Sequence, residues 1–170
     1  MSDNDFSGSN PIRRIWHWIR VKAQGFVFSE DKKTLKEVTN KEIAEVVIPD
    51  SVTKIGSGAF FRCTGLTSVI IPDSVTEIGS DAFEGCTSLT SVVIPDSVTI
   101  IGSGAFFRCT GLTSVVIPDS VTIIGDWAFN GCTSLTSVVI PDSVTEISWR
   151  TFDGAGCEEQ VKRDYPHLFE

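Results

Sequence analysis

The stretch Val92–Thr99 reads VVIPDSVT, and its core, IPDSVT, occurs five times in the chain. The copies follow one another at a constant spacing of 23 residues, beginning at Ile48, Ile71, Ile94, Ile117 and Ile140. A unit of about 20 to 50 residues repeated with this fidelity predicts a stacked array, in which each unit buries its apolar side chains against its neighbours.

The second unit, residues 69–91, shows how one repeat is expected to fold. Val69 and Ile71 are separated by one residue, which is the period of a half-buried strand. Pro72 and Asp73 end that strand, because proline has no N–H for a ladder and aspartate favours turns. A second short extended piece follows, and the rest is too short for more than about one turn of helix. Stacking such units about 4.8 Å apart places like residues over like residues.

The pattern L-x-x-V-x-I-P-x-x-V-x-x-I-G-x-x-A-F-x-x-C, from Leu66 to Cys86, resembles the BspA-like class of bacterial leucine-rich repeat. The resemblance covers roughly residues 43–152. It implies an α/β, mostly β leucine-rich repeat solenoid: a right-handed superhelix with a parallel sheet on one face, short extended or helical turns opposite, and caps at both ends. It also implies a binding or adhesion role, because members are often surface proteins that contact other proteins.

The ends of an array expose a bare core and are expected to carry caps. We expect a cap hairpin over residues 26–45, repeats over 46–147, and a degenerate repeat with a cap helix over 148–170. The cap helix is expected to bury one face, formed by Cys157, Val161 and Tyr165.

Residues 1–25 differ in kind from the repeats and predict a polar tail and an amphipathic helix. Asn10 suits the N-cap, and Pro11 suits the first helical position. The basic residues Arg13, Arg14, His17 and Arg20 point away from the apolar face. We expect the helix over 11–22 to dock on the chain's own acidic repeats through Ile12, Ile15, Trp16 and Ile19. A partner's groove and a membrane surface are the two alternatives.

Charge and hydropathy narrow the classes of partner. The net charge is −8, and residues 46–170 carry six basic against fifteen acidic side chains, which argues against a nucleic acid partner. Neither a secretory signal nor an apolar run long enough to span a membrane is present in the sequence. The default expectation is therefore a cytoplasmic protein, whereas the family resemblance would allow the cell surface.

The residues that most often carry chemistry are expected to have structural roles. Cys63, Cys86, Cys109 and Cys132 recur with the repeat and form no short metal-binding pair, so buried free thiols are expected rather than zinc ligands or disulfides. We expect the aspartates after each proline to cap turns, with calcium binding as the alternative; they are Asp50, Asp73, Asp96, Asp119 and Asp142.

Catalysis is not expected from this sequence. The two histidines, His17 and His167, lie in opposite terminal segments, and no phosphate-binding loop or catalytic triad pattern occurs. An active site needs unlike groups that converge on one point, which a repeated unit does not provide. The chain is predicted to be a non-catalytic interaction or adhesion scaffold that needs no cofactor or metal. The alternatives are a peripheral membrane scaffold attached through the first helix and a carbohydrate or metal binder that uses the aspartates.

The outward face of the first strands is the predicted contact surface. One apolar residue of each strand points outward, namely Val47, Ile70, Val93, Val116 and Val139, and serines flank the row at Ser68, Ser91, Ser114 and Ser137. A row of five aliphatic side chains approaches the largest apolar patch that a monomer usually exposes, and serine does not guard it as a charged residue would. The row predicts an interface for a protein partner or a second copy, with β-propensity alone as the competing explanation.

Overall fold

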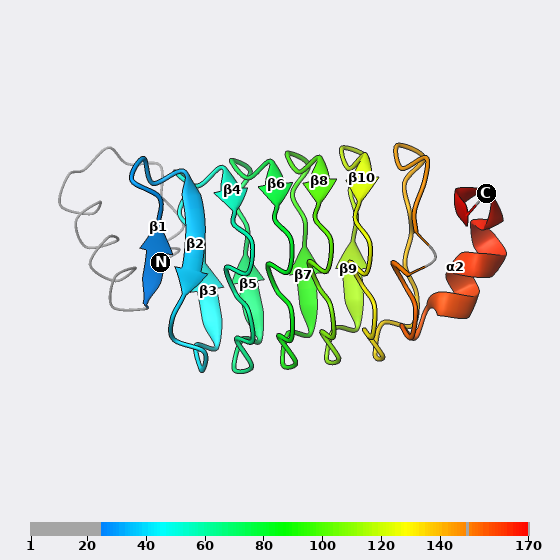
Figure 1. Ribbon diagram of the computed structural model, residues 1–170, viewed down its shortest axis with the longest axis horizontal. Helices are drawn as coiled ribbons and strands as arrows, with labels where there is room; N and C mark the ends of the chain where they lie inside the picture. The colour runs from blue at the N-terminus through cyan, green and yellow to red at the C-terminus, as the bar shows by residue number, and fades with distance from the viewer. Residues whose placement is uncertain (1–24, 149, 170) are drawn as a thin grey trace, which may run out of the picture.

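Two short strands in each unit build the fold, which the computed structural model describes over residues 25–148 and 150–169 (Figure 1). The first strands are β3 (Glu45–Val47), β5 (Ser68–Ile70), β7 (Ser91–Val93) and β9 (Ser114–Val116). The second strands are β4 (Lys54–Ile55), β6 (Glu77–Ile78), β8 (Ile100–Ile101) and β10 (Ile123–Ile124). Successive units lie side by side as rungs along one axis, so the predicted mostly β solenoid is confirmed. The helix predicted over 11–22, with its docking residues, lies outside the described residues.

The continuous sheet of the solenoid is built from the second strands. It has six strands in the order β1-β2-β4-β6-β8-β10, and the strands from β2 onward are parallel. The register is that of the repeat, because Ile55 pairs with Ile78 and Ile78 pairs with Ile101. An antiparallel hairpin of β1 (Phe26–Phe28) and β2 (Thr34–Val38) begins this sheet. The hairpin therefore covers the first rung, and its second strand, β2, pairs directly with β4 of that rung.

The first strands do not form the single five-stranded sheet that the sequence predicted. β3 pairs with β5 and β7 pairs with β9, both parallel and in register, but β5 and β7 belong to different sheets. The fifth segment, around Val139, is not a strand. Each of these strands has only three residues, so the loss of one or two ladder hydrogen bonds between two rungs is enough to divide the sheet.

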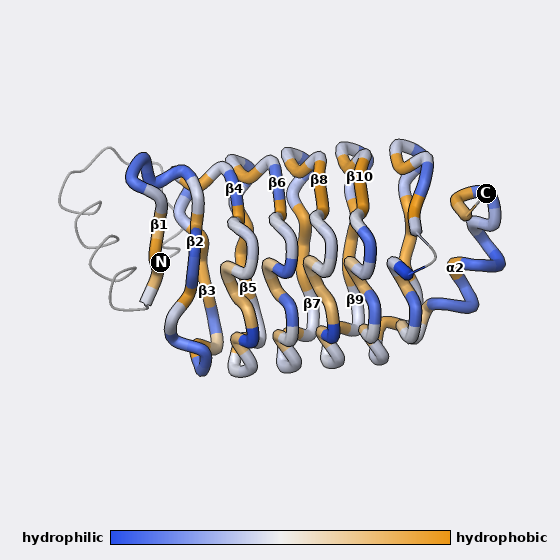
Figure 2. The backbone as a smooth tube through the Cα atoms, viewed as in Figure 1, coloured by the Kyte–Doolittle hydropathy of each residue, from blue (hydrophilic) through white to orange (hydrophobic). Residues whose placement is uncertain are grey.

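Phenylalanine rings stack along the centre of the solenoid and form its core. Phe60, Phe83, Phe106, Phe129 and Phe152 occupy the same position in five successive units, and neighbouring ring centroids lie 4.7 to 5.3 Å apart with nearly parallel planes. All five side chains are buried. Apolar segments recur at matching heights along the rungs in Figure 2. The core is thus one continuous ladder rather than a set of separate clusters.

The expected helical turns are absent from the described repeats, where residues 57–62 and their equivalents form hydrogen-bonded turns. The N–H groups of Gly58, Phe60 and Arg62 donate to carbonyl oxygens of the next rung, at 2.7 to 2.9 Å. The intervening N–H groups close turns within the rung, as from Phe61 to the Gly58 oxygen at 2.9 Å. This alternation requires left-handed backbone at two positions of each turn, which a helix excludes.

The C-terminal cap covers the last rung with α2 (Glu158–Asp164) and the 3-10 helix η1 (Pro166–Phe169). Its side chains bind the backbone N–H groups that a further rung would have received. The N–H of Val138 donates to Gln160 Oε1 at 3.1 Å, and that of Ile140 donates to Tyr165 Oη at 3.2 Å. Polar side chains thereby replace the missing strand at this edge.

Candidate interaction surfaces

The outward face of the first strands exposes a row of aliphatic side chains. In each of these strands the middle residue is buried and the two ends are exposed, as a pleated strand over a core requires. The outward residues are between 53% and 74% exposed, and they are Val47, Ile70, Val93, Val116 and Val139. Their inward neighbours Val69, Val92 and Val115 are buried in the core.

A groove of about 830 Å³ runs over the middle three rungs of this face. Its floor includes Ile70, Val93 and Val116, which are three of the five predicted contact residues. Serines line the side where the strands begin, and aspartates line the side where they end, at Ser68, Ser91, Asp73, Asp96 and Asp119. The remaining predicted residues lie outside the lining of the groove, namely Val47, Val139, Ser114 and Ser137.

The aspartates beside the groove do not cap turns, so that prediction is wrong. The turn after Ile71 is closed by the backbone bond from Val75 N to Pro72 O at 3.0 Å, and the hydroxyl of Ser74 donates to the Val52 oxygen of the previous rung at 2.6 Å. Among the described residues, no group donates a hydrogen bond to the Asp73 carboxylate, and no basic group lies within 4 Å of it. The same holds for Asp96 and Asp119, so the groove has a row of carboxylates that the described residues leave available.

The cysteines form a buried ladder of free thiols, as predicted. Three of the thiols donate a hydrogen bond to a phenylalanine carbonyl oxygen of the previous rung at 3.1 Å, and they are Cys86, Cys109 and Cys132. The sequence did not predict these bonds. Burial raises the pKa of Cys86 and of Cys132 to about 12, so these thiols stay neutral and unreactive at ordinary pH. Within residues 25–148 and 150–169, no three His, Cys, Asp or Glu side chains are placed to hold a metal ion.

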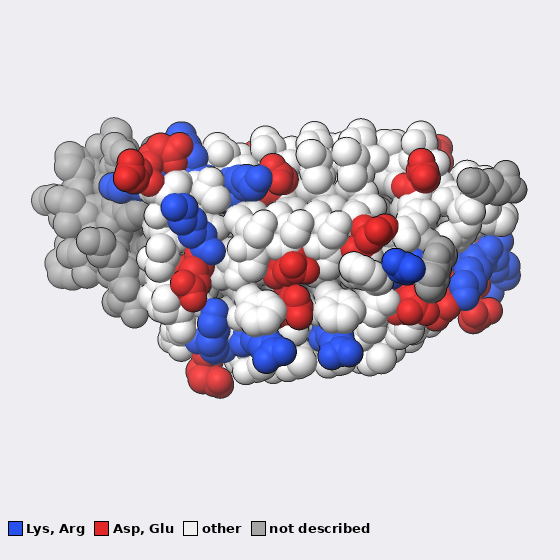
Figure 3. Space-filling view, viewed as in Figure 1, with Lys and Arg blue, Asp and Glu red and all other residues white. Residues whose placement is uncertain are grey.

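A second exposed surface, here called the variable face, lies on the turns that follow the second strands. It consists of three equivalent positions in five units, occupied by Gly58, Phe61, Arg62; Asp81, Glu84, Gly85; Gly104, Phe107, Arg108; Trp127, Asn130, Gly131; and Arg150, Asp153, Gly154. The groove changes little between rungs, whereas this face changes at every rung. On the side shown in Figure 3, basic and acidic side chains are interspersed over the middle rungs rather than separated by sign.

Arginine and glycine alternate over the first four units of the variable face, and each of these arginines lies next to the glycine of the following rung. A Cβ added to Gly85 would lie 3.2 Å from Arg62 Cγ, and one added to Gly131 would lie 3.3 Å from Arg108 Cγ. The guanidinium of each arginine lies over the ring of the preceding phenylalanine, at 5.1 Å for Arg62 and 5.0 Å for Arg108. The glycine of the next rung thus permits a fixed pair of guanidinium and ring.

Backbone strain is concentrated on this face. Of the five described non-glycine residues with positive φ, four belong to it, and they are Arg62, Asp81, Arg108 and Trp127. A left-handed conformation costs an L-residue on the order of 1–2 kcal/mol. Trp127, at φ 57°, is the bulkiest of the four; it is 45% exposed, and the Arg150 guanidinium lies 5.5 Å from its ring.

The charges of the variable face influence one another. Glu84 lies among Asp81, Arg62 and Arg108, and its pKa is raised by burial and by the negative charge of Asp81, while the two arginines partly oppose the shift. Asn130 links two rungs further along, because its Nδ2 donates to Asp153 Oδ2 at 3.2 Å. Polar groups therefore lie between the aromatic rings of this face.

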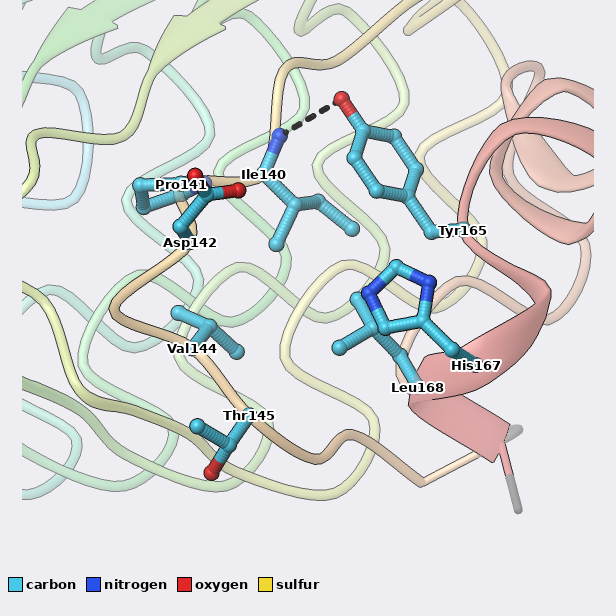
Figure 4. A pocket seen from close by; sticks show the side chains of 8 residues that line it. All are labelled: Ile140, Pro141, Asp142, Val144, Thr145, Tyr165, His167 and Leu168. Atoms are coloured by element: carbon cyan, nitrogen blue, oxygen red, sulfur yellow. Dashed lines mark hydrogen bonds between the residues drawn. The ribbon is translucent and has the colours of Figure 1, made fainter.

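A small pocket of about 190 Å³ lies between the last rung and the C-terminal cap (Figure 4). Its lining includes Asp142, Tyr165 and His167. The Tyr165 hydroxyl already accepts the Ile140 N–H, so this pocket is part of the junction between repeat and cap.

No helix within the described ranges is both long and apolar enough to cross a bilayer.

The solved structures similar to this chain include three leucine-rich repeat proteins. A leucine-rich repeat protein from Bacteroides ovatus is 34% identical with a TM-score of 0.65, over 78% of this chain and 36% of that one. The T. pallidum leucine-rich repeat protein is 28% identical with a TM-score of 0.63, over 80% and 76%. A leucine rich cell surface protein from Faecalibacterium prausnitzii is 33% identical with a TM-score of 0.55, over 78% and 44%. This chain thus spans only about a third of the Bacteroides ovatus protein.

The repeats also match a known sequence family. No curated protein matches the chain. The BspA type leucine rich repeat region matches residues 36–158 in six copies, which is more than half of the chain. With the solenoid and its parallel register, this match shows that the chain belongs to the BspA-type leucine-rich repeat family.

Proposed function

We propose that the chain is a protein-binding scaffold whose contact surface is the groove over β5, β7 and β9. The observation that carries the proposal is the row of aliphatic side chains, each more than half exposed, on the floor of a groove of about 830 Å³. Complete burial of an exposed valine or isoleucine stabilises a complex by about 1.5–3 kcal/mol. Since Ile70, Val93 and Val116 are roughly 60% exposed, covering all three supplies about 3–5 kcal/mol.

The proposed partner presents apolar side chains next to lysine or arginine. Asp73, Asp96 and Asp119 form one edge of the groove without a basic group nearby, so a basic partner segment would find complementary charge there. A second copy is a poorer occupant, because both copies carry a net charge of −8.

The family supports a scaffold of this kind. Leucine-rich repeat proteins are in general interaction scaffolds without catalytic activity, and one similar structure is described as a cell surface protein. We therefore propose that this chain also acts at a cell surface, which protease accessibility on intact source cells would test.

Replacing the groove floor tests the proposed contact surface. The variant Ile70→Thr/Val93→Thr/Val116→Thr keeps β-branched side chains in the strands and removes much of the apolar surface. A matched control, Ile100→Thr/Ile123→Thr, makes the same change on the second strands. The probe is a peptide array in which lysine alternates with valine, leucine or phenylalanine, together with an array of glutamate counterparts.

The proposed function predicts that the full chain binds lysine peptides and not glutamate peptides. Kd should weaken at least tenfold in the groove variant and should not change in the control. Equal binding by the groove variant, or no binding to any lysine peptide, would refute the proposal. A change of oligomeric state in light scattering that is confined to the groove variant would assign the groove to a second copy instead.

A further inference from the structure

Side-chain variety in this array lies on the variable face. The groove floor contains only isoleucine and valine, so it offers nearly the same contacts on each rung. The variable face carries phenylalanine, glutamate, phenylalanine and asparagine at one equivalent position, at Phe61, Glu84, Phe107 and Asn130. A ligand that distinguishes this chain from another array of the same repeat would contact this face.

Trp127 combines a strained backbone with a partly exposed ring. Its equivalents in the first and third units are Gly58 and Gly104, which adopt the left-handed backbone without strain. The tryptophan is strained there, and 45% of its surface remains exposed. Strain at an exposed aromatic residue points to a ligand contact.

The arrangement of rings and polar groups repeats every second rung. Phe61 with Arg62 and Phe107 with Arg108 are equivalent pairs two rungs apart, roughly 10 Å at the usual strand spacing. The planar polar groups of Glu84 and Asn130 lie on the rungs that follow each pair. A ligand that matches this face has a regular repeat, apolar patches that stack on rings, and hydroxyl groups between them.

The charge of the face selects among such ligands. Its three arginines are balanced by three carboxylates, Asp81, Glu84 and Asp153. Nucleic acid and acidic polymers would meet the carboxylates, and basic peptides would meet the arginines, so the balance favours a neutral ligand.

We propose that the variable face binds a neutral polysaccharide. The C–H faces of its sugar rings pack against the pairs of ring and guanidinium at Phe61 with Arg62, Phe107 with Arg108 and Trp127 with Arg150. Its hydroxyl groups exchange hydrogen bonds with the guanidinium groups, Glu84 and Asn130. In a chain whose repeating unit is two sugars, every second ring presents the same face, which matches the two-rung spacing of Phe61 and Phe107, and Trp127 lies on the rung after Phe107. This site is separate from the groove and does not depend on the proposed function of that groove.

Affinity electrophoresis tests the proposal with named polymers. The full chain is run through gels that contain soluble β-glucan, galactomannan, xylan or dextran, and through a gel with anionic alginate. The variants are Trp127→Gly and Phe61→Ala/Phe107→Ala, with the groove variant Ile70→Thr/Val93→Thr/Val116→Thr as the matched control. Trp127→Gly restores the residue of the equivalent positions and keeps the left-handed backbone, and its melting temperature shows whether the variant keeps the fold.

At least one neutral polymer should retard the wild type and the groove variant equally. Each variable-face variant should weaken that Kd at least tenfold, as expected when ring contacts are lost. The proposal is overturned if no neutral polymer retards the chain, if only alginate does, or if the variable-face variants bind as the wild type does. It is also overturned if Trp127→Gly loses binding only together with its fold, as shown by a lower melting temperature.

Discussion

Removing one ring from the phenylalanine ladder should lower the free energy of unfolding by an amount that depends on how many other rings it stacks on. Phe106 stacks on Phe83 at 5.1 Å and on Phe129 at 5.2 Å, whereas Phe60 has one ring neighbour, Phe83, at 4.7 Å. Both side chains are fully buried, so replacement by leucine retains an apolar side chain at two comparable sites. An aromatic pair contributes about 0.5–1.5 kcal/mol beyond its buried area. Phe106→Leu should therefore lower the free energy of unfolding by about 1–3 kcal/mol, and Phe60→Leu by about 0.5–1.5 kcal/mol.

Equilibrium unfolding in urea, followed by far-ultraviolet circular dichroism, measures both values. The denaturant slope should be the same for both variants, because each exposes the same surface on unfolding. In a stacked array a central rung contacts neighbours on both sides, so this coupling also makes Phe106→Leu more destabilising than Phe60→Leu. If Phe60→Leu costs as much as Phe106→Leu or more, the ring pairs are not what stabilises this core.

Three further outcomes are expected. Because burial raises the pKa of Cys86 and Cys132 to about 12 from 9.0, the unfolded chain loses these protons first as pH rises. The unfolding free energy should be unaffected by these thiols below pH 9 and should fall above it, by up to about 1.4 kcal/mol per pH unit for each; a Cys86→Ala/Cys132→Ala variant should fall less between pH 8 and pH 10.5 in urea unfolding. Tyr165→Phe leaves the Ile140 N–H without its acceptor, so the free energy of unfolding should drop by about 1–3 kcal/mol, and an unchanged urea midpoint would contradict this role. Trp16→Ala should lower the melting temperature and alter tryptophan emission if the first helix docks on the repeats; no change in either would exclude that docking.

The inward positions could be predicted because each meets a copy of itself. Ile78 lies between Ile55 and Ile101, and Phe83 lies between Phe60 and Phe106, so one assignment fixes the whole row. The outward position of Ile70 follows from the same alternation.

Features that depend on contacts between unlike groups were not predicted. Turn statistics favoured Asp73, yet Ser74 makes the bond, because its hydroxyl can donate to the carbonyl oxygen of the rung before and a carboxylate cannot. The interruption between β5 and β7 depends on a few hydrogen bonds between two rungs, which a repeated sequence does not reveal. The left-handed backbone at Trp127 did leave a signal, since it aligns with Gly58, Asp81 and Gly104, and glycine and aspartate both tolerate positive φ.

The seating of each arginine above a glycine also bears on how such an array changes length in evolution. The units 46–68 and 92–114 differ only at Lys54 and Ile100, so the sequence records duplication of a pair of units. If residues 46–68 alone were copied next to themselves, an arginine would take the place that Gly85 now occupies after Arg62. Its Cβ would lie 3.2 Å from Arg62 Cγ, which is a tight contact. Copying two units, 2 × 23 = 46 residues, keeps every arginine above a glycine. Relatives of this chain should therefore gain or lose repeats in pairs, and arrays with an odd insertion should carry a compensating change at the arginine or the glycine.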